Sequence, residues 1–438
     1  MPQISPSSQA ASATAPQPGK LPNLRWIICG LLLFASTINY VDRQTIAVLK
    51  PTLQHSLHWS ESDYGWIVFS FQFAYAAMML LAGRIIDAIG TRLGFAITMV
   101  LWSLAAMGHA LASGALSFGV ARFLLGAGEA GNFPASIKTV AEWFPRRERA
   151  LATGIFNAGT NIGAVLAPPL VVWLTLRWSW HEAFIFTGSL GLLWLIFWLA
   201  LYYPPLQHKR LSSEELAIIQ SDHDLALGAS AIPWRQLVSC RQAWGVIIAK
   251  FCTDPVWWFY IFWLPSYLIQ GRGMTLKQIG YFAWIPFLAA DIGSVLGGWF
   301  SGKLLALGWS VNAARKTAMA ACAFCMPVGI AAVFAPKAWM AIALISVSTS
   351  AHQGWSANVY TLASDLFPRR AVATIIGMAG AGGAIGGMII APVAGYTLQW
   401  FHTYVPLFIV GGIMHPLALG LVHLIVPDIK PVAIAADA

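Results

Sequence analysis

The sequence predicts an all-α membrane protein in which twelve transmembrane helices form two six-helix halves. The chain has 438 residues, of which 58% are hydrophobic and 10% are charged, whereas a soluble protein carries about 25% charged residues. Apolar runs of about twenty residues, enough to cross a bilayer core of ~30 Å, recur along the whole chain. A segment of the first half also recurs in the second half, which indicates an internal duplication.

The apolar runs place six predicted spans in each half of the chain. In the first half they cover residues 25–48, 62–84, 95–113, 117–141, 150–173 and 183–203. In the second half they cover residues 243–269, 276–299, 314–335, 338–362, 371–395 and 404–426. The predicted units are a disordered cytoplasmic tail (1–24), a six-helix bundle (25–203), a cytoplasmic linker (204–242), a second six-helix bundle (243–426) and a cytoplasmic tail (427–438).

The long linker contains a helix signal. Ser212 or Ser213 followed by Glu215 is the pattern of a capped helix N-terminus, so we expect a short helix between the two bundles.

Basic residues are distributed unevenly between the two sides of the predicted membrane. With both termini in the cytoplasm, 17 of the 26 Lys and Arg residues fall in cytoplasmic segments and five in external ones. The external ones are Lys50, Arg177, Arg272, Lys277 and Lys337. Because cytoplasmic loops carry an excess of basic residues, we expect a multi-pass protein of the cell inner membrane with both termini inside. The same distribution accounts for the net charge of +9 without a nucleic-acid partner.

An internal repeat relates the two halves. Residues 144–147, Phe-Pro-Arg-Arg, recur as residues 367–370, which is 223 residues later, and the same offset relates Gly159 to Gly382. Two parallel halves suit an alternating-access transporter, whose substrate site lies between the halves near the membrane midplane.

A motif between the second and third predicted spans contains Gly83, Asp87, Gly90 and Arg92. It resembles the G-x-x-x-D-x-x-G-x-R signature of the major facilitator superfamily. Gly83 would permit close helix approach, Gly90 would permit a tight turn, and Asp87 with the arginine would latch neighbouring helices. The corresponding loop of the second half, residues 298–303, lacks the aspartate, so we expect a weaker latch there.

Four charged residues lie inside predicted spans of the first half. Asp42 and Arg43 belong to span one, and Arg122 and Glu129 belong to span four. Arg122 and Glu129 are seven residues apart, which places them on one face of a helix. Charges inside a membrane usually face a cavity and mark function. The pattern favours a proton-exchanging carboxylate beside an arginine that binds an anion, and a purely structural salt-bridge cluster is the alternative.

Several segments resemble the anion:cation symporter family, and the resemblance extends over essentially the whole chain. They are residues 39–43, 121–131 and 142–145. Residues 254–265 and 351–360 are similar to the bacterial hexuronate branch of that family. The resemblance implies proton-coupled import of an organic anion, with galacturonate or glucuronate as the expected substrate.

The same resemblance implies roles for residues of the first half. The implied substrate contacts are Arg43, which would bind the carboxylate, with Tyr40, Tyr75 and Thr160. The implied proton-coupling residues are Asp42 and Glu129, with Arg122 paired to Asp42. Members that import aldonates have Gln at the position of Thr160, and the shorter side chain here argues for a different substrate.

The second half is expected to contact the sugar. Tyr260 in the aromatic span seven could stack on a sugar or hydrogen-bond to it, although Trp and Tyr also gather at membrane interfaces. In span ten the candidates for hydroxyl contacts are Trp355, Ser356, Asn358 and Tyr360, of which only one or two need face the cavity.

Other polar residues of the second half are assigned to gating. Lys250 and Asp254 are four residues apart on one helix and are predicted to pair. Asp291 in span eight is interpreted as a latch or a second polar contact. His352 corresponds to Glu129 at the repeat offset, which leaves both proton transfer and plain packing open.

Several functions have no support in the sequence. It contains no nucleotide-binding loop, zinc-site spacing or catalytic set, so we expect no cofactor, no metal and no enzyme activity. The expected partners are a small organic anion, protons and the lipid bilayer, with the monomer as the functional unit. The remaining alternatives are an importer of an aldonate, an aldarate or an aromatic acid, a multidrug exporter, and a sugar-acid sensor that does not transport.

Overall fold

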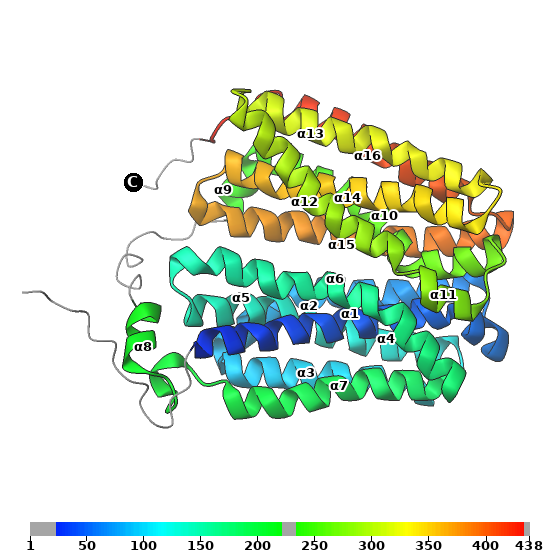
Figure 1. Cartoon of the computed structure of the whole chain (residues 1–438), viewed down its shortest axis with the longest axis horizontal. Coiled ribbons are helices and arrows are strands. Elements are labelled where there is room, and N and C mark those ends of the chain that lie inside the picture. The colour runs from blue at the N-terminus through cyan, green and yellow to red at the C-terminus, as the bar shows by residue number, and fades with distance from the viewer. Residues whose placement is uncertain (1–22, 221–233, 433–438) are drawn as a thin grey trace, which may run out of the picture.

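The structure is a computed structural model that describes residues 23–220 and 234–432. Most of the two predicted tails and part of the linker therefore lie outside the described residues. Within the described ranges, helices account for all the regular secondary structure. Figure 1 shows two bundles lying side by side, one coloured blue to green and the other green to red.

The first bundle contains the helices α1 (Leu24–Leu57), α2 (Glu61–Ile89), α3 (Thr91–Gly108), α4 (Ala115–Glu129), α5 (Asn132–Trp143), α6 (Arg146–Arg177) and α7 (Trp180–Leu201). The linker contributes α8 (Ser213–Gln220) and α9 (Trp234–Ser239). The second bundle contains α10 (Arg241–Ser266), α11 (Leu276–Phe282), α12 (Ile285–Ala306), α13 (Val311–Cys325), α14 (Ala338–Leu366), α15 (Arg369–Phe401) and α16 (Val405–Ile425).

Each predicted span coincides with a helix or with two consecutive helical segments. Span four divides into α4 and α5, where Pro134 has no N–H to donate to the carbonyl of Ala130. Span nine changes from α13 to a 3-10 helix over Met326–Phe334, where Pro327 lies in the first turn. Span eight divides into α11 and α12, and Pro286 lies in the first turn of α12. These breaks follow from proline chemistry and leave the path across the membrane intact.

Eight of the helical segments in the described ranges are long and apolar enough to cross a membrane, and a bent α2 counts as a ninth. The spans that fall short are the fourth, seventh and tenth. They carry buried polar groups, including Glu129, Lys250 and Asn358. A helix that faces a polar interior does not need an apolar surface all round, so the shortfall marks the helices that line the centre.

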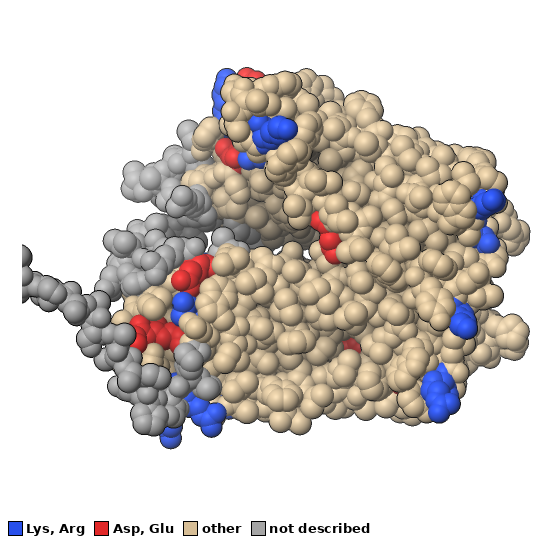
Figure 2. All heavy atoms as spheres, in the orientation of Figure 1, with Lys and Arg blue, Asp and Glu red and all other residues tan. Residues whose placement is uncertain are grey.

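The outer surface between the two ends of the bundles is apolar. Ile196, Phe197 and Val295 are among its exposed side chains. On the face drawn in Figure 2, Lys and Arg gather at the two ends and leave most of the middle free of charge. This pattern is the one expected of a protein surrounded by lipid.

The hydrogen bonds described here between the two bundles lie toward one end of the molecule. We call the end at which α8 and α9 lie the linker end and the opposite end, at which α11 lies, the far end (Figure 1). Near the far end, Tyr64 donates a hydrogen bond to the carbonyl oxygen of Phe262 at 2.9 Å, and Trp66 donates to Tyr396 at 3.1 Å. Figure 2 shows the surface hollowed between the bundles toward the linker end. The space between the bundles is therefore closed at the far end and open at the linker end.

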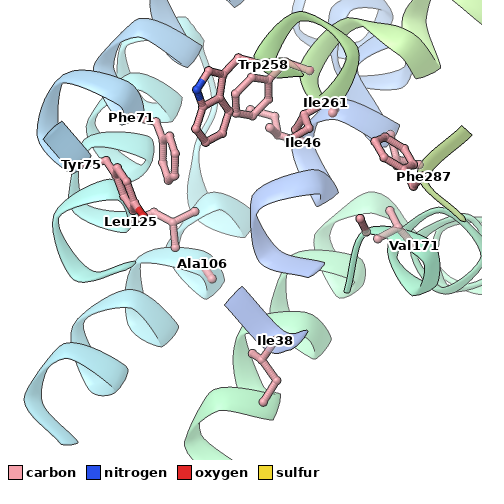
Figure 3. Packing of buried hydrophobic residues seen from close by; sticks show 14 of the residues in the cluster. Ile38, Ile46, Phe71, Tyr75, Ala106, Leu125, Val171, Trp258, Ile261 and Phe287 are labelled. Carbon is pink, nitrogen blue, oxygen red and sulfur yellow. The ribbon is translucent and has the colours of Figure 1, made fainter. Parts of the chain in front are cut away.

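The buried core continues across the interface between the bundles. Trp258, Ile261 and Phe287 of the second bundle belong to one cluster with Ile46 and Phe71 of the first (Figure 3). This shared core forms the floor of the open cleft and positions the polar residues described next.

Candidate functional site

A buried ion pair lies at the centre of the first bundle. Arg43 on α1 donates from Nε and Nη2 to Oε2 of Glu129 on α4, at 3.0 and 2.8 Å. The two side chains are 2% and 0% exposed. Asn39, one helical turn before Arg43, accepts a further hydrogen bond from Nη2 at 3.2 Å. Oε1 of Glu129 has no hydrogen-bond partner among the described residues. Both hydrogen bonds of the ion pair therefore fall on one carboxylate oxygen and leave the other free.

Aromatic rings enclose the guanidinium of Arg43. The ring centres of Tyr40, Tyr75 and Phe71 lie 4.7, 4.9 and 5.2 Å from its central carbon, and the ring of Trp258 lies 5.3 Å away. Cations are attracted to the faces of such rings. Trp258 comes from α10, so the second bundle contributes directly to the surroundings of Arg43. The sequence places Trp258 among the aromatic residues of span seven that could stack on a sugar, together with Trp257, Tyr260 and Trp263, but only Tyr260 was assigned to the substrate site.

Arg122 and Asp42 are not partners in this structure, which corrects the predicted pairing. Arg122 makes a single long hydrogen bond, 3.4 Å to the carbonyl oxygen of Arg43, and its guanidinium lies 4.5 Å from the ring of Phe71. Asp42 points instead toward Thr187 and Trp102, and neither of its oxygens has hydrogen-bond geometry with a described residue. The cluster thus contains one acid and one base that are buried without a charged partner.

Thr160 lies beside the first-half cluster on α6. Its hydroxyl donates to the carbonyl oxygen of Asn157 at 2.7 Å and contacts Oδ1 of Asn161 at 3.3 Å. The two asparagines were missed in the sequence, although amide side chains four residues apart inside a predicted span are a usable signal. Thr160 itself is buried, and both hydrogen-bond contacts of its hydroxyl are to residues of α6.

The candidates of span ten separate into buried and exposed residues. Asn358 is buried and donates to the carbonyl oxygens of Gly297 and Gly354, at 3.1 and 2.9 Å, so it joins α14 to α12. Trp355 and Ser356 are buried as well. Tyr360 is 43% exposed and lies close enough to Tyr40 of the first bundle to interact with it electrostatically. Tyr360 is the member of this group that the structure places at the cleft.

Tyr260 does not reach the central cluster. It is 2% exposed and lies among residues of the second bundle, next to Ser348 and the ring of Phe408. The structure therefore places this residue in the packing of α10 and not beside Arg43.

The predicted pair of Lys250 and Asp254 is confirmed, with 3.0 Å between Nζ and Oδ2. Lys250 also donates to the hydroxyl of Tyr360 at 3.3 Å and lies 4.8 Å from its ring. The second bundle thus has its own cation, held by an acid and an aromatic ring beside the cleft. Asp291 on α12 is half-buried and shows no contact with this pair, and its Oδ1 has no partner among the described residues.

His352 belongs to a buried histidine pair. Its Nδ1 lies 3.0 Å from Nε2 of His415 on α16, and the ring of Trp257 stacks on it at 5.3 Å. His352 is 2% exposed, so in this conformation it packs inside the second bundle. His415 gave no signal in the sequence because its position falls outside the repeat and the recognised segments.

The motif between α2 and α3 makes contacts within the first bundle. Asp87 accepts a hydrogen bond from Lys138 on α5 at 2.7 Å. Arg92 donates to the carbonyl oxygen of Leu199 at 2.6 Å. Gly90 has a φ of 86° and forms the predicted turn, whereas a side chain at Gly83 would meet no atom within 4 Å. The close approach expected at Gly83 is therefore absent in this conformation.

The second bundle has a corresponding latch whose acid comes from another helix. Arg315 on α13 pairs with Asp365 on α14 at 2.8 Å and donates to Ser301 on α12 at 2.8 Å. Asp365 lies 223 residues after Glu142, at the repeat offset. Residues 298–303 alone predicted a weaker latch in the second bundle. The ion pair of Arg315 and Asp365 lies outside those residues and provides the latch.

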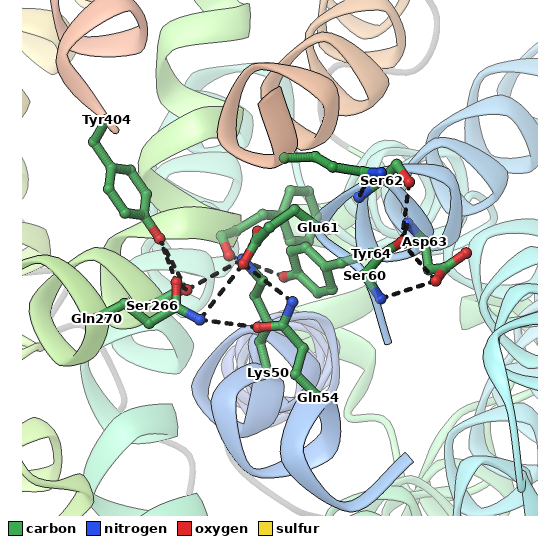
Figure 4. A network of polar contacts seen from close by, with 12 residues as sticks. Lys50, Gln54, Ser60, Glu61, Ser62, Asp63, Tyr64, Ser266, Gln270 and Tyr404 are labelled. Carbon is green, nitrogen blue, oxygen red and sulfur yellow. Dashed lines mark hydrogen bonds and ion pairs between the residues drawn. The ribbon is translucent and has the colours of Figure 1, made fainter. Parts of the chain in front are cut away.

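A polar network closes the far end of the cleft (Figure 4). The ammonium of Lys50, 0% exposed, donates to Glu61 at 2.6 Å and to Ser266 of the second bundle at 3.1 Å. Gln270 of the second bundle donates to Gln54 at 3.0 Å. These bonds hold the two bundles together on the side opposite the open cleft.

Comparisons with known proteins agree with this architecture. Residues 32–351 match the sequence profile described as Major Facilitator Superfamily. The chain is 36% identical over 383 residues to a hexuronate transporter of Escherichia coli (strain K12), covering 86% of this chain and 88% of that protein. It is 39% identical over 284 residues to a galacturonate transporter of Dickeya chrysanthemi, covering 64% and 82%.

A solved structure shows the same fold at low sequence identity. The crystal structure of a bacterial homologue of the human lysosomal transporter Spinster, in an inward-facing and occupied conformation, aligns with a TM-score of 0.73 at 17% identity over 92% of this chain and 97% of that one. The chain belongs to the major facilitator superfamily. It is a multi-pass membrane transporter and not an enzyme, as predicted.

Proposed function

We propose that the chain is a proton-coupled symporter that imports a sugar acid, with a hexuronate such as galacturonate or glucuronate as the substrate. The observation that carries this proposal is the ion pair of Arg43 and Glu129, enclosed by aromatic rings at the junction of the two bundles. The names of the two relatives, a hexuronate and a galacturonate transporter, support the choice of substrate.

Arg43 can serve either Glu129 or a substrate carboxylate. A planar guanidinium binds carboxylates through its fork of N–H donors, and the Nε and Nη2 donors of Arg43 are already on Glu129. A substrate carboxylate that binds through the same Nε–Nη2 fork displaces that of Glu129. Leaving a buried charge without its partner costs about 3–5 kcal/mol, so an ionised Glu129 resists displacement. A proton on Glu129, accepted at the free Oε1, removes this cost, and proton and substrate consequently load together.

Residues of the second bundle are proposed to form the opposite wall of the site. Tyr360 is exposed to the cleft and accepts a hydrogen bond from Lys250, and Trp258, a member of the shared core, has its ring 5.3 Å from the guanidinium of Arg43. Aromatic and hydroxyl groups suit a sugar ring, whose faces carry C–H groups and whose edges carry hydroxyls. Asp42 is proposed as a second protonation site, and Arg122 as a cation that attracts the anion.

We further propose that the linker end faces the cytoplasm of a bacterial cell, with the protein as a monomer in the inner membrane and both termini inside. The excess of basic residues in the predicted cytoplasmic segments supports this orientation. The cleft that is open at the linker end then corresponds to an inward-open state of an alternating-access cycle.

Uptake of labelled galacturonate into proteoliposomes tests the proposal. Wild-type protein is expected to accumulate galacturonate under an inward proton gradient, with competition by glucuronate. Glu129→Gln is expected to lose gradient-driven accumulation and to retain exchange of labelled for unlabelled substrate. Glu182→Gln, at an exposed glutamate near the start of α7, is the matched control and should behave as wild type. Unchanged proton coupling in Glu129→Gln would remove the assigned role, and absence of wild-type uptake would remove the substrate.

A further inference from the structure

We propose that Trp102 on α3 and Thr187 on α7 are positioning residues for Asp42, whose ionised carboxylate their N–H and O–H groups bind when the proton leaves. This inference rests on the proposed function, in which Asp42 is the second protonation site, and adds two residues to it. Trp102, Thr187 and Asp42 are 0%, 1% and 2% exposed. Bulk water therefore does not solvate this acid, and protein groups must do so when it is charged.

The helices α1, α3 and α7 meet along one line inside the first bundle. Trp194 on α7 marks the first contact. Its Nε1 donates to the carbonyl oxygen of Leu31 on α1 at 2.7 Å, and its ring centre lies 5.0 Å from that of Phe95 on α3. The faces of the three helices that carry these residues are therefore turned toward one another.

The same three faces carry the proposed group nearer the far end. α7 runs antiparallel to α3, since Trp198 near the end of α7 donates to the carbonyl oxygen of Arg92 near the start of α3 at 3.0 Å. Residues seven or eleven positions apart are separated by about two or three whole helical turns, so their side chains point in nearly the same direction. The residues related in this way are Leu31 and Asp42 on α1, Phe95 and Trp102 on α3, and Trp194 and Thr187 on α7.

Glycines let the helices approach closely at the level of the two donors. A Cβ atom at Gly188, the neighbour of Thr187, would lie 2.9 Å from the carbonyl oxygen of Ser103. Ser103 directly follows Trp102. A Cβ atom at Gly128 on α4 would lie 2.7 Å from the backbone nitrogen of Trp102. Close backbone packing on α7 and α4 thus fixes where Trp102 lies.

The carboxylate of Asp42 faces both donors. It is close enough to Thr187 and Trp102 to interact with them, although neither of its oxygens has hydrogen-bond geometry in this conformation. Nε1 of Trp102 has no hydrogen-bond partner among the described residues. The hydroxyl of Thr187 donates to the carbonyl oxygen of Phe184 over 3.5 Å, which is longer than an ordinary hydrogen bond. Both donors are therefore available to Asp42.

Hydrogen bonds from these donors would favour the charged form of Asp42. Burial without partners favours the protonated form of a carboxyl group, and donors to its oxygens favour the ionised form. Asp42 can therefore hold its proton while the donors stand off, as in this conformation, and release it when they close on it. Glu129 and Arg122 of α4 also interact electrostatically with Asp42, and His109 at the end of α3 interacts with Arg122.

The test follows the proton on Asp42 by infrared titration of the full chain reconstituted in lipid. The band to follow is the carbonyl band of a protonated carboxyl group that is lost in Asp42→Asn. Trp102→Phe and Thr187→Val each remove one donor, so each should raise the pH at which this band disappears by about one unit, a tenfold change in proton affinity. Thr187→Ser keeps the hydroxyl and should titrate as the wild type.

Matched controls remove the same chemical groups elsewhere. Trp198→Phe and Thr175→Val take away an indole N–H and a hydroxyl that donate to backbone carbonyls of the first bundle, and both should leave the titration unchanged. Size-exclusion profiles identify variants that fail to fold, and Thr187→Val, which only exchanges a hydroxyl for a methyl group, keeps the test decisive if Trp102→Phe fails. An unchanged titration in the folded donor variants, an equal shift in the controls, or the absence of an Asp42 band at every pH would overturn the inference.

Uptake of labelled galacturonate separates this inference from the proposed function. Wild-type uptake together with an unchanged titration in the donor variants would remove the role of Trp102 and Thr187 and leave hexuronate symport in place. A shifted titration in a chain that takes up no hexuronate would keep their role and remove the proposed substrate. Where both hold, the pH at which uptake declines should rise in Thr187→Val and stay unchanged in Thr175→Val.

Discussion

A leucine in place of Gly65 should hold the far end of the cleft open. Gly65 on α2 packs on α15 across the interface between the bundles. A Cβ atom at this position would lie 2.8 Å from the carbonyl oxygen of Ala391 and 3.2 Å from Cα of Pro392, and one at Gly395 would lie 2.6 Å from the carbonyl oxygen of Glu61. Contacts this short with backbone force the helices apart even for alanine. Overpacking of this kind costs about 1–3 kcal/mol.

The cost applies only to the conformation in which the far end is closed. A difference of ~1–3 kcal/mol between two states changes their ratio by roughly 5–150-fold. Opening of the far end can be followed at Ser266, which is buried between the bundles there. The reporter protein lacks the five native cysteines and carries Ser266→Cys. The rate at which an impermeant maleimide labels this cysteine should rise within that range in Gly65→Leu.

A matched substitution at the open end controls for general damage. A side chain at Gly154 on α6 would meet no atom within 4 Å in this conformation, so Gly154→Leu should leave labelling at Ser266→Cys unchanged or lower it. Equal labelling of Gly65→Leu and its parent, in folded protein, would refute the reasoning. An equal increase in both variants would show loss of structure in place of a shift between states.

Other contacts give further predictions. Lys50→Met removes the ammonium that joins Glu61 to Ser266 of the second bundle, so uptake should slow and labelling should rise at a cysteine placed at the buried Ala394, next to Gly395, with Ser266 kept; unchanged labelling would show that the network does not hold this end closed. Glu215→Gln weakens the cap that the linker helix provides for the N-terminal amides of α1, including that of Leu24, and a loss of about 0.5–2 kcal/mol should appear as a melting temperature below that of the wild type; an unchanged melting temperature would show that this cap does not stabilise the protein. Asn358→Leu removes two buried hydrogen bonds, one to Gly297 of α12 and one to Gly354 within α14; each is worth about 0.5–1.5 kcal/mol, so the variant should have a lower melting temperature while its preference between galacturonate and glucuronate stays unchanged.

The fold followed from the sequence because apolar length and the internal repeat are properties of the chain itself. The predicted spans coincide with the helices, and the divisions in spans four, eight and nine each have a proline near the break. The functional roles of the site residues remain predictions, but the structure shows which of them come together. Glu129 and Arg43 do, and Lys250 and Asp254 do.

The wrong pairing of Arg122 with Asp42 has a geometric cause. Asp42 and Arg43 are adjacent, so their side chains leave α1 about 100° apart and point toward different neighbours. Arg43 turns toward Glu129, and Asp42 turns toward Thr187. Helical periodicity gives this difference in direction, but the rotation of α1 relative to α4 is set by packing and is absent from a single sequence.

The unequal surroundings of the two buried acids have an electrical consequence. Glu129 is matched by Arg43, so a cycle that loads one proton on Glu129 and one monoanionic substrate on Arg43 moves no net charge. Asp42 has no such counter-ion within hydrogen-bonding reach. Any proton that it carries would add one positive charge to the loaded form. A membrane potential would then contribute about 2.3 kcal/mol per 100 mV, and uptake would respond to voltage as well as to pH.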